Sequence, residues 1–215
     1  MTIQNTHPHR PGAAKAPATR KGAATRARLV RAARTVFAEK GFIQTRITDI
    51  ATAAESANGT FYIYFDSKET ALKAVVDEVI EEFLVTLRTD RPEASDPATV
   101  IAHDNRQYIL AYRAHADIMR VIEQVATFND EFAELRRTIR ERFVDRAARS
   151  IAAWQSDGLC PADFSPRTMA GLLVAMVDNF SYNWLSLGHS YADDEIADAM
   201  TAIWVRSMRL GESSM

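Results

Sequence analysis

The segment from Gly41 to Lys68 holds the residue types in this chain that are best suited to binding chemistry. It reads GFIQTRITDIATAAESANGTFYIYFDSK, with hydroxyl, carboxamide and aromatic side chains concentrated in its last third. The pattern predicts two short helices, at about 46–54 and 58–64, with almost nothing between them. A short helix of small polar and aromatic residues can enter the major groove of DNA while the helix before it crosses the backbone. Thr45 can cap the first of these helices and offer its hydroxyl to a phosphate.

A preceding helix is needed to position this pair. Its pattern covers about residues 25–40, where Leu29, Ala33 and Phe37 recur on one face and Gly41 is a suitable C-cap. The three helices would share a small core of apolar residues, formed by Phe37, Ile47, Ile50, Ala51, Ala54 and Phe65. The arrangement is typical of a helix-turn-helix.

Helical periodicity continues to the end of the chain. A long amphipathic helix is predicted at about 67–88, and Arg91 to Pro97 breaks its pattern. Further helices are predicted at about 98–113, 115–126, 129–156, 166–187 and 193–209. No alternation typical of a strand lasts, so we expect an all-α fold with about nine helices.

Charge is distributed unevenly along the chain. Residues 1–38 contain eight Lys or Arg and no Asp or Glu, whereas the rest carries 18 basic and 28 acidic residues. Residues 1–22 are rich in Pro, Ala, Thr and basic residues and lack apolar periodicity, so we expect a disordered basic arm. A basic end on an acidic body indicates a polyanion bound at that end, although basic tails are also common without one.

Chemistry other than binding finds little support in the sequence. The five histidines form no pair with metal-ligand spacing in an ordered segment, and no phosphate loop or nucleophile elbow occurs. Cys160 is the only cysteine, which excludes an internal disulfide, and it has no evident activating base. Neither a signal-peptide core nor a bilayer-spanning apolar stretch is present. We therefore expect a cytoplasmic protein without catalytic activity, cofactor, metal or membrane.

The segment around the two short helices also matches a known pattern at the same spacing. The matching residues are Gly41-Phe42, Thr45, Asp49-Ile50-Ala51, Ala54, Gly59-Thr60-Phe61-Tyr62, Tyr64-Phe65 and Ser67-Lys68-Glu69. In these residues the chain resembles the DNA-binding domain of the TetR family of transcriptional regulators. The resemblance covers about residues 25–72, a third of the chain. It implies an all-α homodimer with an N-terminal three-helix helix-turn-helix domain and a C-terminal helical domain for ligand binding and dimerisation.

The resemblance assigns roles to the matching residues. Asn58, Gly59, Thr60 and Tyr62 fall on the recognition helix, which would contact base edges and nearby phosphates. Tyr64 and Lys68 would contact phosphates, and a phosphate would reverse the penalty of a cation in the first turn of a helix. The complete set of expected DNA-binding residues is Thr45, Thr48, Asn58, Gly59, Thr60, Tyr62, Tyr64 and Lys68.

The chain departs from the family pattern in the turn before the recognition helix. Glu55-Ser56-Ala57 stands where the family favours Gly-Val-Ser. The turn therefore loses a glycine suited to positive φ, and Ala57 cannot cap the helix as a serine would, although Ser56 could cap it one residue earlier. Glu55 also adds negative charge near the DNA, and Thr48 stands where a basic residue is frequent. Cations near the N-terminus could compensate by contacting phosphates, namely Lys15, Arg20, Lys21, Arg26 and Arg28.

Beyond residue 72 the resemblance implies architecture rather than a particular ligand. Similar proteins dimerise through their last two long helices and hold an effector among the middle ones. The expected interface residues are Leu173, Val177, Trp184, Met200 and Trp204. The expected effector site mixes polar tips with aromatic and Met side chains, a composition suited to a largely hydrophobic ligand. Its candidate residues are Asn105, Tyr108, Tyr112, Met119, Glu123, Phe128, Phe143, Met176, Asn179 and Tyr182.

The sequence thus predicts a DNA-binding transcriptional regulator, with repression as the usual mode of the family. A small hydrophobic effector would release the homodimer from a double-stranded, palindromic operator. We expect the arm at 1–22, the helix-turn-helix domain at 23–66 and the effector-binding and dimerisation domain at 67–215, with helix 67–88 as connector. Two alternatives stay open: a helical protein-interaction module without DNA binding, and an enzyme that converts a small molecule.

Overall fold

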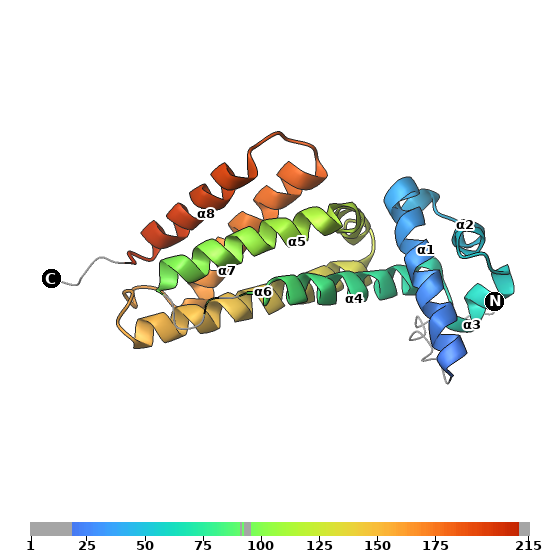
Figure 1. Cartoon of the computed structure of the whole chain (residues 1–215), viewed down its shortest axis with the longest axis horizontal. Helices are drawn as coiled ribbons and strands as arrows, with labels where there is room; N and C mark the ends of the chain where they lie inside the picture. The colour runs from blue at the N-terminus through green and yellow to red at the C-terminus, as the bar shows by residue number, and fades with distance from the viewer. Residues whose placement is uncertain (1–18, 91, 93–95, 211–215) are drawn as a thin grey trace, which may run out of the picture. The chain divides into compact units, whose positions relative to one another are not determined.

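The computed structural model describes residues 19–90, 92 and 96–210. Within these residues the chain forms eight α-helices, one short π-helical turn and no strand (Figure 1). The prediction of an all-α fold is confirmed. The chain divides into two compact units inside the fourth helix, between Glu78 and Val79.

The first helix begins inside the segment predicted as an arm. Helix α1 runs over Arg20–Gln44, and the hydroxyl of Thr19 caps it by accepting a hydrogen bond from the backbone N–H of Gly22 at 3.1 Å. The prediction of disorder is therefore wrong for residues 20–22, because the Thr19 cap and the helix formers that follow it favour a helix. Residues 1–18 of the arm, Lys15 among them, lie outside the described residues.

Gly41 interrupts α1 as predicted. Its φ of 71° and ψ of 168° leave the helical region, and the chain bends so that the Phe42 ring packs on the Phe37 ring with centroids 5.8 Å apart. Glycine adopts this positive φ without the steric penalty that a side chain would bring. The short extension from Phe42 to Gln44 leads into the next helix.

Helix α2 covers Ile47–Ala53, and Arg46 rather than Thr45 stands at its N-cap. The backbone N–H of Arg46 donates to Asp49 Oδ2 at 2.9 Å, and Lys40 forms an ion pair with the same carboxylate at 3.0 Å. Both contacts stabilise the ionised form, so the pKa of Asp49 lies below its ordinary value. The hydroxyl of Thr45 instead donates to the carbonyl of Gly41 at 2.7 Å, which makes the predicted Thr45 cap wrong.

The turn between α2 and α3 holds Glu55 at a φ of 48°, in the left-handed region. Helix α3 covers Asn58–Tyr64, and its N-cap residue Ala57 makes no side-chain capping bond. The Ser56 hydroxyl lies 3.5 Å from the carbonyl of Ala51, so Ser56 does not cap α3 and the start of the helix is not shifted. A residue with a Cβ pays about 1–2 kcal/mol for the left-handed conformation. The prediction that this turn suits glycine is confirmed.

Helix α4 covers Lys68–Thr86 and passes through the division between the two units. Ser67 and Thr70 cap its start reciprocally, since each backbone N–H donates to the other hydroxyl, at 3.1 and 3.2 Å. One stripe of the helix is fully buried and consists of Leu72, Val75, Val76, Val79, Ile80 and Phe83. This stripe confirms the amphipathic pattern expected for the helix.

The second unit contains four more α-helices: α5 at Pro97–Ala126, α6 at Asp130–Ser156, α7 at Pro166–Ser181 and α8 at Asp193–Ser207. Polar side chains cap three of them. Asp96, Asn129 and Ser165 accept hydrogen bonds from backbone N–H groups in the first turns of α5, α6 and α7. Proline at the first position of α5 and α7 suits a helix start, because that N–H has no partner within the helix.

Two predicted boundaries in this unit are wrong. The helices expected at 98–113 and 115–126 form the single helix α5, because the residues between them include no Gly or Pro that would end it. The described residues therefore hold eight α-helices rather than about nine. The helix expected at 166–187 ends at Ser181, and Tyr182–Ser186 continues it as a π-helical turn.

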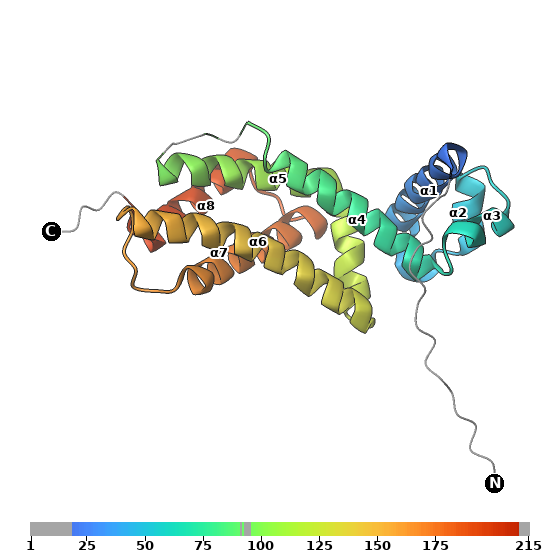
Figure 2. The same cartoon turned by 90° about the horizontal axis from the view of Figure 1, so that it is seen from below.

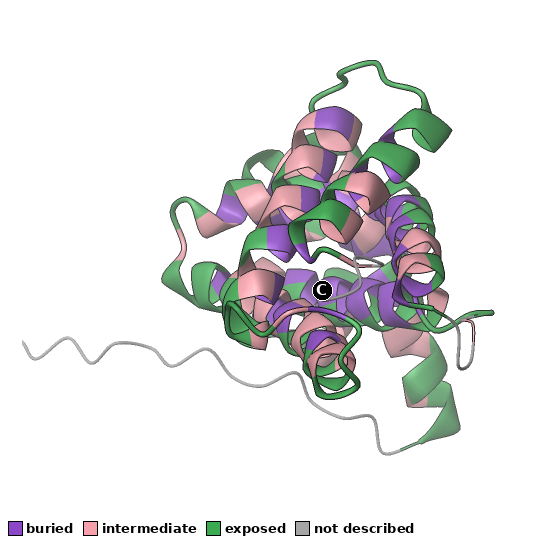
Figure 3. Cartoon of the chain, turned by 90° about the vertical axis from the view of Figure 1, so that its left-hand side faces the viewer, coloured by how far each residue is buried: buried purple, intermediate pink, exposed green. Residues whose placement is uncertain are grey.

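The core of the second unit lies where its helices face one another. Helix α6 packs along α7, and α5 packs along both α6 and α8 (Figure 2). Buried residues gather on the inward faces of these helices and exposed residues on the outward faces (Figure 3). One cluster centres on Ile101, Ile151 and Leu173, and a second centres on Val177 and Trp184.

The strained turn predicts the effect of one substitution. Glu55→Gly should stabilise the chain by about 0.5–1 kcal/mol, because the relief of strain exceeds the larger entropy that glycine gives the unfolded chain. Thermal unfolding followed by circular dichroism should show a melting temperature higher by about 1–4 °C. Glu55→Ala is the matched control, since it removes the charge but keeps the Cβ. An equal gain in both variants would mean that charge, not backbone conformation, destabilises the turn.

Candidate functional site

Helix α3 presents a polar edge to solvent. Asn58, Gly59 and Tyr62 are exposed, with 53% of Tyr62 accessible, while Phe61 is fully buried. Phe65 follows Phe61 by four residues, and the two rings pack with centroids 5.5 Å apart. Because Phe61 points into the core, the opposite side of this short helix faces outwards, and Ile63 is 60% exposed there.

Gly59 has no internal reason to be glycine. A Cβ built at this position would meet no atom within 4 Å, and the φ of Gly59 does not lie in the left-handed region. Neither packing within the chain nor backbone conformation therefore requires the missing side chain. A close approach of another molecule to the backbone at Gly59 would require the missing side chain, and the sequence predicts such an approach.

The other residues predicted to contact DNA have different surroundings. Thr48 is exposed on α2, whereas Thr60 and Tyr64 are half-buried on α3. Thr45 is only 2% exposed, and its hydroxyl is bound to Gly41. The expected phosphate contact of the Thr45 hydroxyl is therefore not available in this structure, because the turn after α1 buries it.

The ammonium of Lys68 lies against the end of α1. Its Nζ donates to the carbonyls of Phe42, Thr45 and Ile43, at 2.8, 3.2 and 3.3 Å. The same nitrogen stands over the Phe42 ring, 4.4 Å from its centroid, in cation–π geometry. The expectation that this ammonium faces a phosphate is wrong for this structure, since an ammonium has three N–H donors and three carbonyls receive them. Lys68 acts instead as a clamp between the end of α1 and the start of α4.

Cations also line the start of α1. Arg20, Lys21 and Arg28 are exposed there, and the guanidinium of Arg26 stacks on the Phe65 ring at 5.3 Å. These four residues belong to the set expected to contact phosphates. The stacked Arg26 is partly committed to the small core, and the other three side chains reach solvent.

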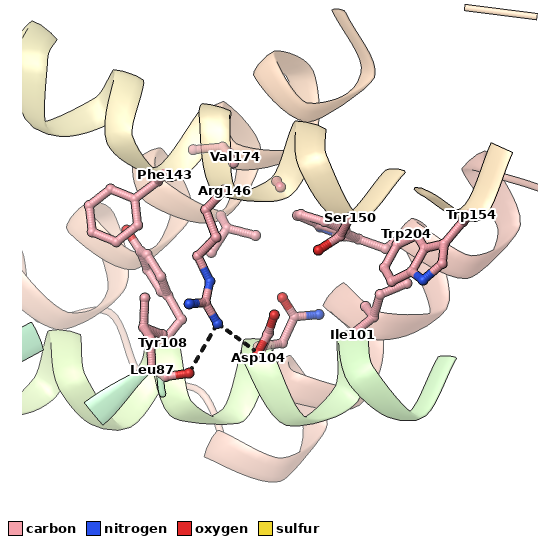
Figure 4. A pocket seen from close by; sticks show the side chains of 13 residues that line it. Leu87, Ile101, Asp104, Tyr108, Phe143, Arg146, Ser150, Trp154, Val174 and Trp204 are labelled. Carbon is pink, nitrogen blue, oxygen red and sulfur yellow. Dashed lines mark hydrogen bonds and ion pairs between the residues drawn. The ribbon is translucent and has the colours of Figure 1, made fainter. Parts of the chain in front are cut away.

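The second unit encloses a cavity of about 70 Å³. Three candidate effector residues, Asn105, Tyr108 and Phe143, line it together with residues that the sequence analysis did not nominate. The remaining lining residues are Leu87, Ile101, Asp104, Arg146, Ala147, Ser150, Trp154, Val174, Val177 and Trp204. Phe143 and Tyr108 lie at one end, Trp154 and Trp204 at the other, and Arg146 between them (Figure 4).

A smaller cavity of about 30 Å³ shares Tyr108, Phe143 and Val174 with the first. Two further candidates, Met119 and Glu123, line it. Its polar wall is an ion-pair network in which Arg136 binds Glu123 at 2.5 Å and Asp178 receives both Arg140 and, at 3.8 Å, Arg136.

Tyr108 connects the two cavities. Its hydroxyl donates to Asp178 at 3.4 Å. Burial, and secondarily the charge of Asp178, raises the pKa of Tyr108 well above its ordinary value, so the phenol stays protonated and can donate.

The other five candidate effector residues lie elsewhere. Tyr112 is fully buried beside Tyr108, whereas Phe128 is 55% exposed, and Tyr182 is half-buried in the π-helical turn. Met176 and Asn179 line a separate surface groove on α7. These five residues line neither cavity, because periodicity cannot separate the face that lines a cavity from the faces that pack or stay exposed, and their contact with an effector stays a prediction.

The predicted dimer-interface residues are also largely buried within the protomer. Leu173, Val177, Trp184 and Met200 are each 4–5% exposed. The half-buried Trp204 lines the larger cavity. The protomer's own core covers most of their surface, although Trp184 also lines a groove on α7, and their role in a dimer interface stays a prediction. The face left in solvent carries Leu172, which is 67% exposed, and it is continuous with the groove formed by Met176, Asn179, Phe180 and Tyr191.

The residues missed in the cavity did leave a signal in the sequence. Phe143, Ala147, Ser150 and Trp154 follow one another at helical spacing, and Arg146 stands among them. A charged residue on a helix face that otherwise carries apolar or small residues indicates a binding site, because burial of a charge is costly without a partner.

Comparison with known proteins bears on both units. The model of bacterial regulatory proteins of the tetR family matches residues 29–75. The model of the C-terminal domain of the transcriptional regulator EthR matches residues 101–209, just over half of the chain. The chain belongs to the TetR family. Its resemblance to that family, expected from Gly41 to Glu69, is confirmed.

Curated TetR-family relatives align over most of their length. The chain is 28% identical over 207 residues to the HTH-type transcriptional regulator TcmR of Streptomyces glaucescens, covering 87% of this chain and 89% of TcmR. It is 22% identical over 183 residues to EthR of Mycobacterium tuberculosis, covering 84% of this chain and 85% of EthR.

Solved structures share the fold of this TetR-family chain. The fatty acid degradation regulator FadR from Bacillus halodurans has a TM-score of 0.73 at 20% identity, over 86% of this chain and 97% of FadR. Salmonella enterica GusR has a TM-score of 0.71 at 22% identity, over 86% of this chain and 96% of GusR.

Family membership establishes the broad function. The chain is a DNA-binding transcriptional regulator with an N-terminal helix-turn-helix, as the sequence predicted. TetR-family regulators bind operator DNA, hold a small-molecule ligand in the C-terminal domain and act as dimers. Among the described residues, no helix combines the length and apolar character needed to cross a membrane.

The Lys68 clamp predicts a stability effect that a surface cation would not show. Lys68→Met should lower the free energy of unfolding by about 1–3 kcal/mol, because three carbonyls lose a charged donor. Denaturant unfolding followed by circular dichroism measures the loss. Lys21→Met is the control, since Lys21 is exposed on α1. Equal, small effects in the two variants would contradict the clamp.

Proposed function

We propose that this TetR-family regulator is a repressor that reads a palindromic operator through α3 and leaves it when a largely hydrophobic effector binds. The outward-facing edge of α3 carries the proposal. It is polar, it includes a glycine that nothing inside the chain requires, and the buried pair of Phe61 and Phe65 holds it in place. A helix of this kind fits the major groove.

The DNA contacts divide between bases and phosphates. We assign base edges to Asn58, Thr60 and Tyr62 and a close backbone approach to Gly59. Thr48 on α2 and Tyr64 at the end of α3 supply hydroxyls for phosphates. Lys68 acts indirectly by clamping the turn before α2, and the exposed cations of α1 supply the charge that phosphate binding needs.

The domain assignment follows from these roles. We propose that residues 23–66, with the first turn of α1 in addition, form the DNA-binding domain. Residues 67–215 form the effector-binding and dimerisation domain, with α4 as the connector between them. In support, the apolar stripe of α4 is buried along its whole length, so a change in the packing of its second half can act on the helix as a unit.

The effector site is the pair of adjoining cavities in the second unit. Support comes from walls that are mostly apolar or aromatic and carry a few convergent polar groups. Ligand sites for drug-sized molecules are usually about 300–1,000 Å³, so the cavities, about 70 and 30 Å³, must widen on binding. That widening would shift the population towards a state with lower affinity for DNA.

The dimer interface is the exposed apolar face of α7 with the adjoining residues of α8. Leu172 on α7 and Ile203 on α8 are 67% and 45% exposed, and Leu187 and Tyr191 lie between these helices with about half of their surface exposed. A second copy of the chain would cover these side chains, since regulators of this family act as dimers. The operator would then be palindromic, because two-fold symmetry places two copies of α3 on equivalent half-sites.

DNA selected from random duplexes by the full chain provides the test of DNA binding. On the selected duplex, Asn58→Ala and Tyr62→Ala should each weaken binding by about 1–3 kcal/mol, or roughly 5- to 150-fold, in fluorescence anisotropy at fixed salt. Glu39→Gln, an exposed change on α1, is the control. If both α3 variants bind the selected duplex as the unchanged chain does, α3 does not read it.

The interface makes a separate prediction. Leu172→Asp should convert the dimer to monomers in sedimentation at micromolar concentration, because it places a charge at the centre of the covered face. Leu110→Asp is the matched control, since Leu110 is 54% exposed on α5 and lies outside the α7 groove. Dissociation by both variants, or by neither, would reject this face as the interface.

A further inference from the structure

Arg146 is the cation in the wall of the larger cavity. It lies on the face of α6 that also supplies Phe143, Ser150 and Trp154, and its side chain is 22% exposed. Figure 4 shows the guanidinium crossing from α6 towards the opposite wall, between the ends of the cavity. A guanidinium cannot lose its charge at physiological pH, so this part of the cavity keeps a fixed positive group.

Acceptors on the opposite wall hold this guanidinium. Nη2 donates to the carbonyl of Leu87 at 3.1 Å and to Asp104 Oδ1 at 3.3 Å. Both bonds leave from the same nitrogen, whereas the strongest arginine–carboxylate pairs use two parallel bonds of about 2.7–2.9 Å. The distance from Nη2 to Asp104 Oδ1 is therefore one that a better-placed carboxylate could shorten.

The acceptor carbonyl lies at a particular point of the fold. Leu87 is the residue that follows the end of α4, and its own N–H donates to the carbonyl of Phe83 at 3.1 Å. The last carbonyls of a helix have no partner within the helix, so an outside donor stabilises that end. Arg146 supplies this donor from the cavity wall, which joins the contents of the cavity to the end of α4.

We propose that Arg146 binds the carboxylate of an apolar, monoanionic effector and thereby gives up its hydrogen bond to the Leu87 carbonyl at the end of α4. The inference rests on the proposed function in one respect, namely that these cavities are the effector site. The apolar part of the ligand lies against Tyr108 and Phe143 at one end of the cavity, and the carboxylate meets the one fixed cation in this wall. Asp104 is displaced towards water, where its side chain is already 28% exposed.

The size of the cavities limits the size and shape of the ligand. The larger cavity measures about 70 Å³ and the smaller about 30 Å³, and Tyr108, Phe143 and Val174 stand between them. A straight chain of medium length can pass between these side chains once the Tyr108 and Phe143 rings rotate. A bulky polycyclic acid would need a larger rearrangement of a densely packed interior. Octanoate is therefore a suitable probe, and octanol has the same tail without the charge.

Tryptophan fluorescence of the full chain gives the binding readout, because two of its three tryptophans, Trp154 and Trp204, line the cavity. Octanoate should bind at least about tenfold more tightly than octanol, as expected for a charge-assisted pair. Arg146→Gln should remove that preference and leave octanol binding unchanged. Asp104→Asn should tighten octanoate binding, because it removes the competing anion. Arg149→Gln is the control, since Arg149 is exposed on the same helix.

Three outcomes would overturn the proposal, and they are distinguishable. If neither probe alters the fluorescence, the assignment of these cavities as the effector site is rejected, and with it the assignment of Arg146 as the carboxylate-binding residue. If both probes bind equally and Arg146→Gln changes nothing, the effector site stands and only the assignment of the carboxylate is overturned. If Asp104→Asn weakens octanoate binding, Asp104 is part of the site rather than a competitor.

Hydrogen exchange tests the second half of the proposal. With octanoate, amides in residues 84–90 should exchange several-fold faster, because the end of α4 loses the donor from Arg146. Octanol should produce no such change, and neither should octanoate added to Arg146→Gln. Octanoate binding through Arg146 without faster exchange would overturn the release of Leu87.

Discussion

The packing of Phe61 against Phe65 decides which edge of α3 meets the solvent. Both rings are buried in the small core of the first three helices; Phe61 lies on a helix of only seven residues, and Phe65 is its C-cap residue. An isolated helix of this length is not stable in water, so tertiary packing must hold it. Once the two rings are fixed, the directions of Asn58, Gly59 and Tyr62 follow from helical geometry. The exposed edge of α3 therefore depends on an apolar contact inside the core.

Much of the fold could be predicted from the sequence, because the signals that set helices are local. Caps such as Asp96 and Ser165, the glycine at 41 and the stripe of α4 all act within a few residues of where they stand. The errors arose where the signal was missing or misread. No residue between the two halves of α5 favours a helix end, and the capping signal of Thr19 lies within a segment whose composition otherwise predicts disorder.

The candidate site was less predictable, because a side chain's partner depends on tertiary contacts. Thr45 and Lys68 occupy the positions that the family pattern assigns to DNA contacts, yet the turn after Gly41 buries the hydroxyl of one and binds the ammonium of the other. In the second unit, α7 is apolar nearly all round, so its sequence does not say which face the protomer keeps for itself. The cavity depends on where small residues such as Ala147 and Ser150 face larger ones, and this is known only after packing.

The Lys68 clamp has a mechanical meaning. Lys68 is the first residue of α4, and its ammonium holds the carbonyls just before α2, so one side chain ties together the two ends of the stretch that contains α2 and α3. Because both ends of this segment are tied together, its backbone has little freedom to change conformation. When the first turn of α4 tilts, α2 and α3 therefore move with it as one rigid body. The stiffness of this segment arises from a lysine whose hydrogen bonds are made within the chain.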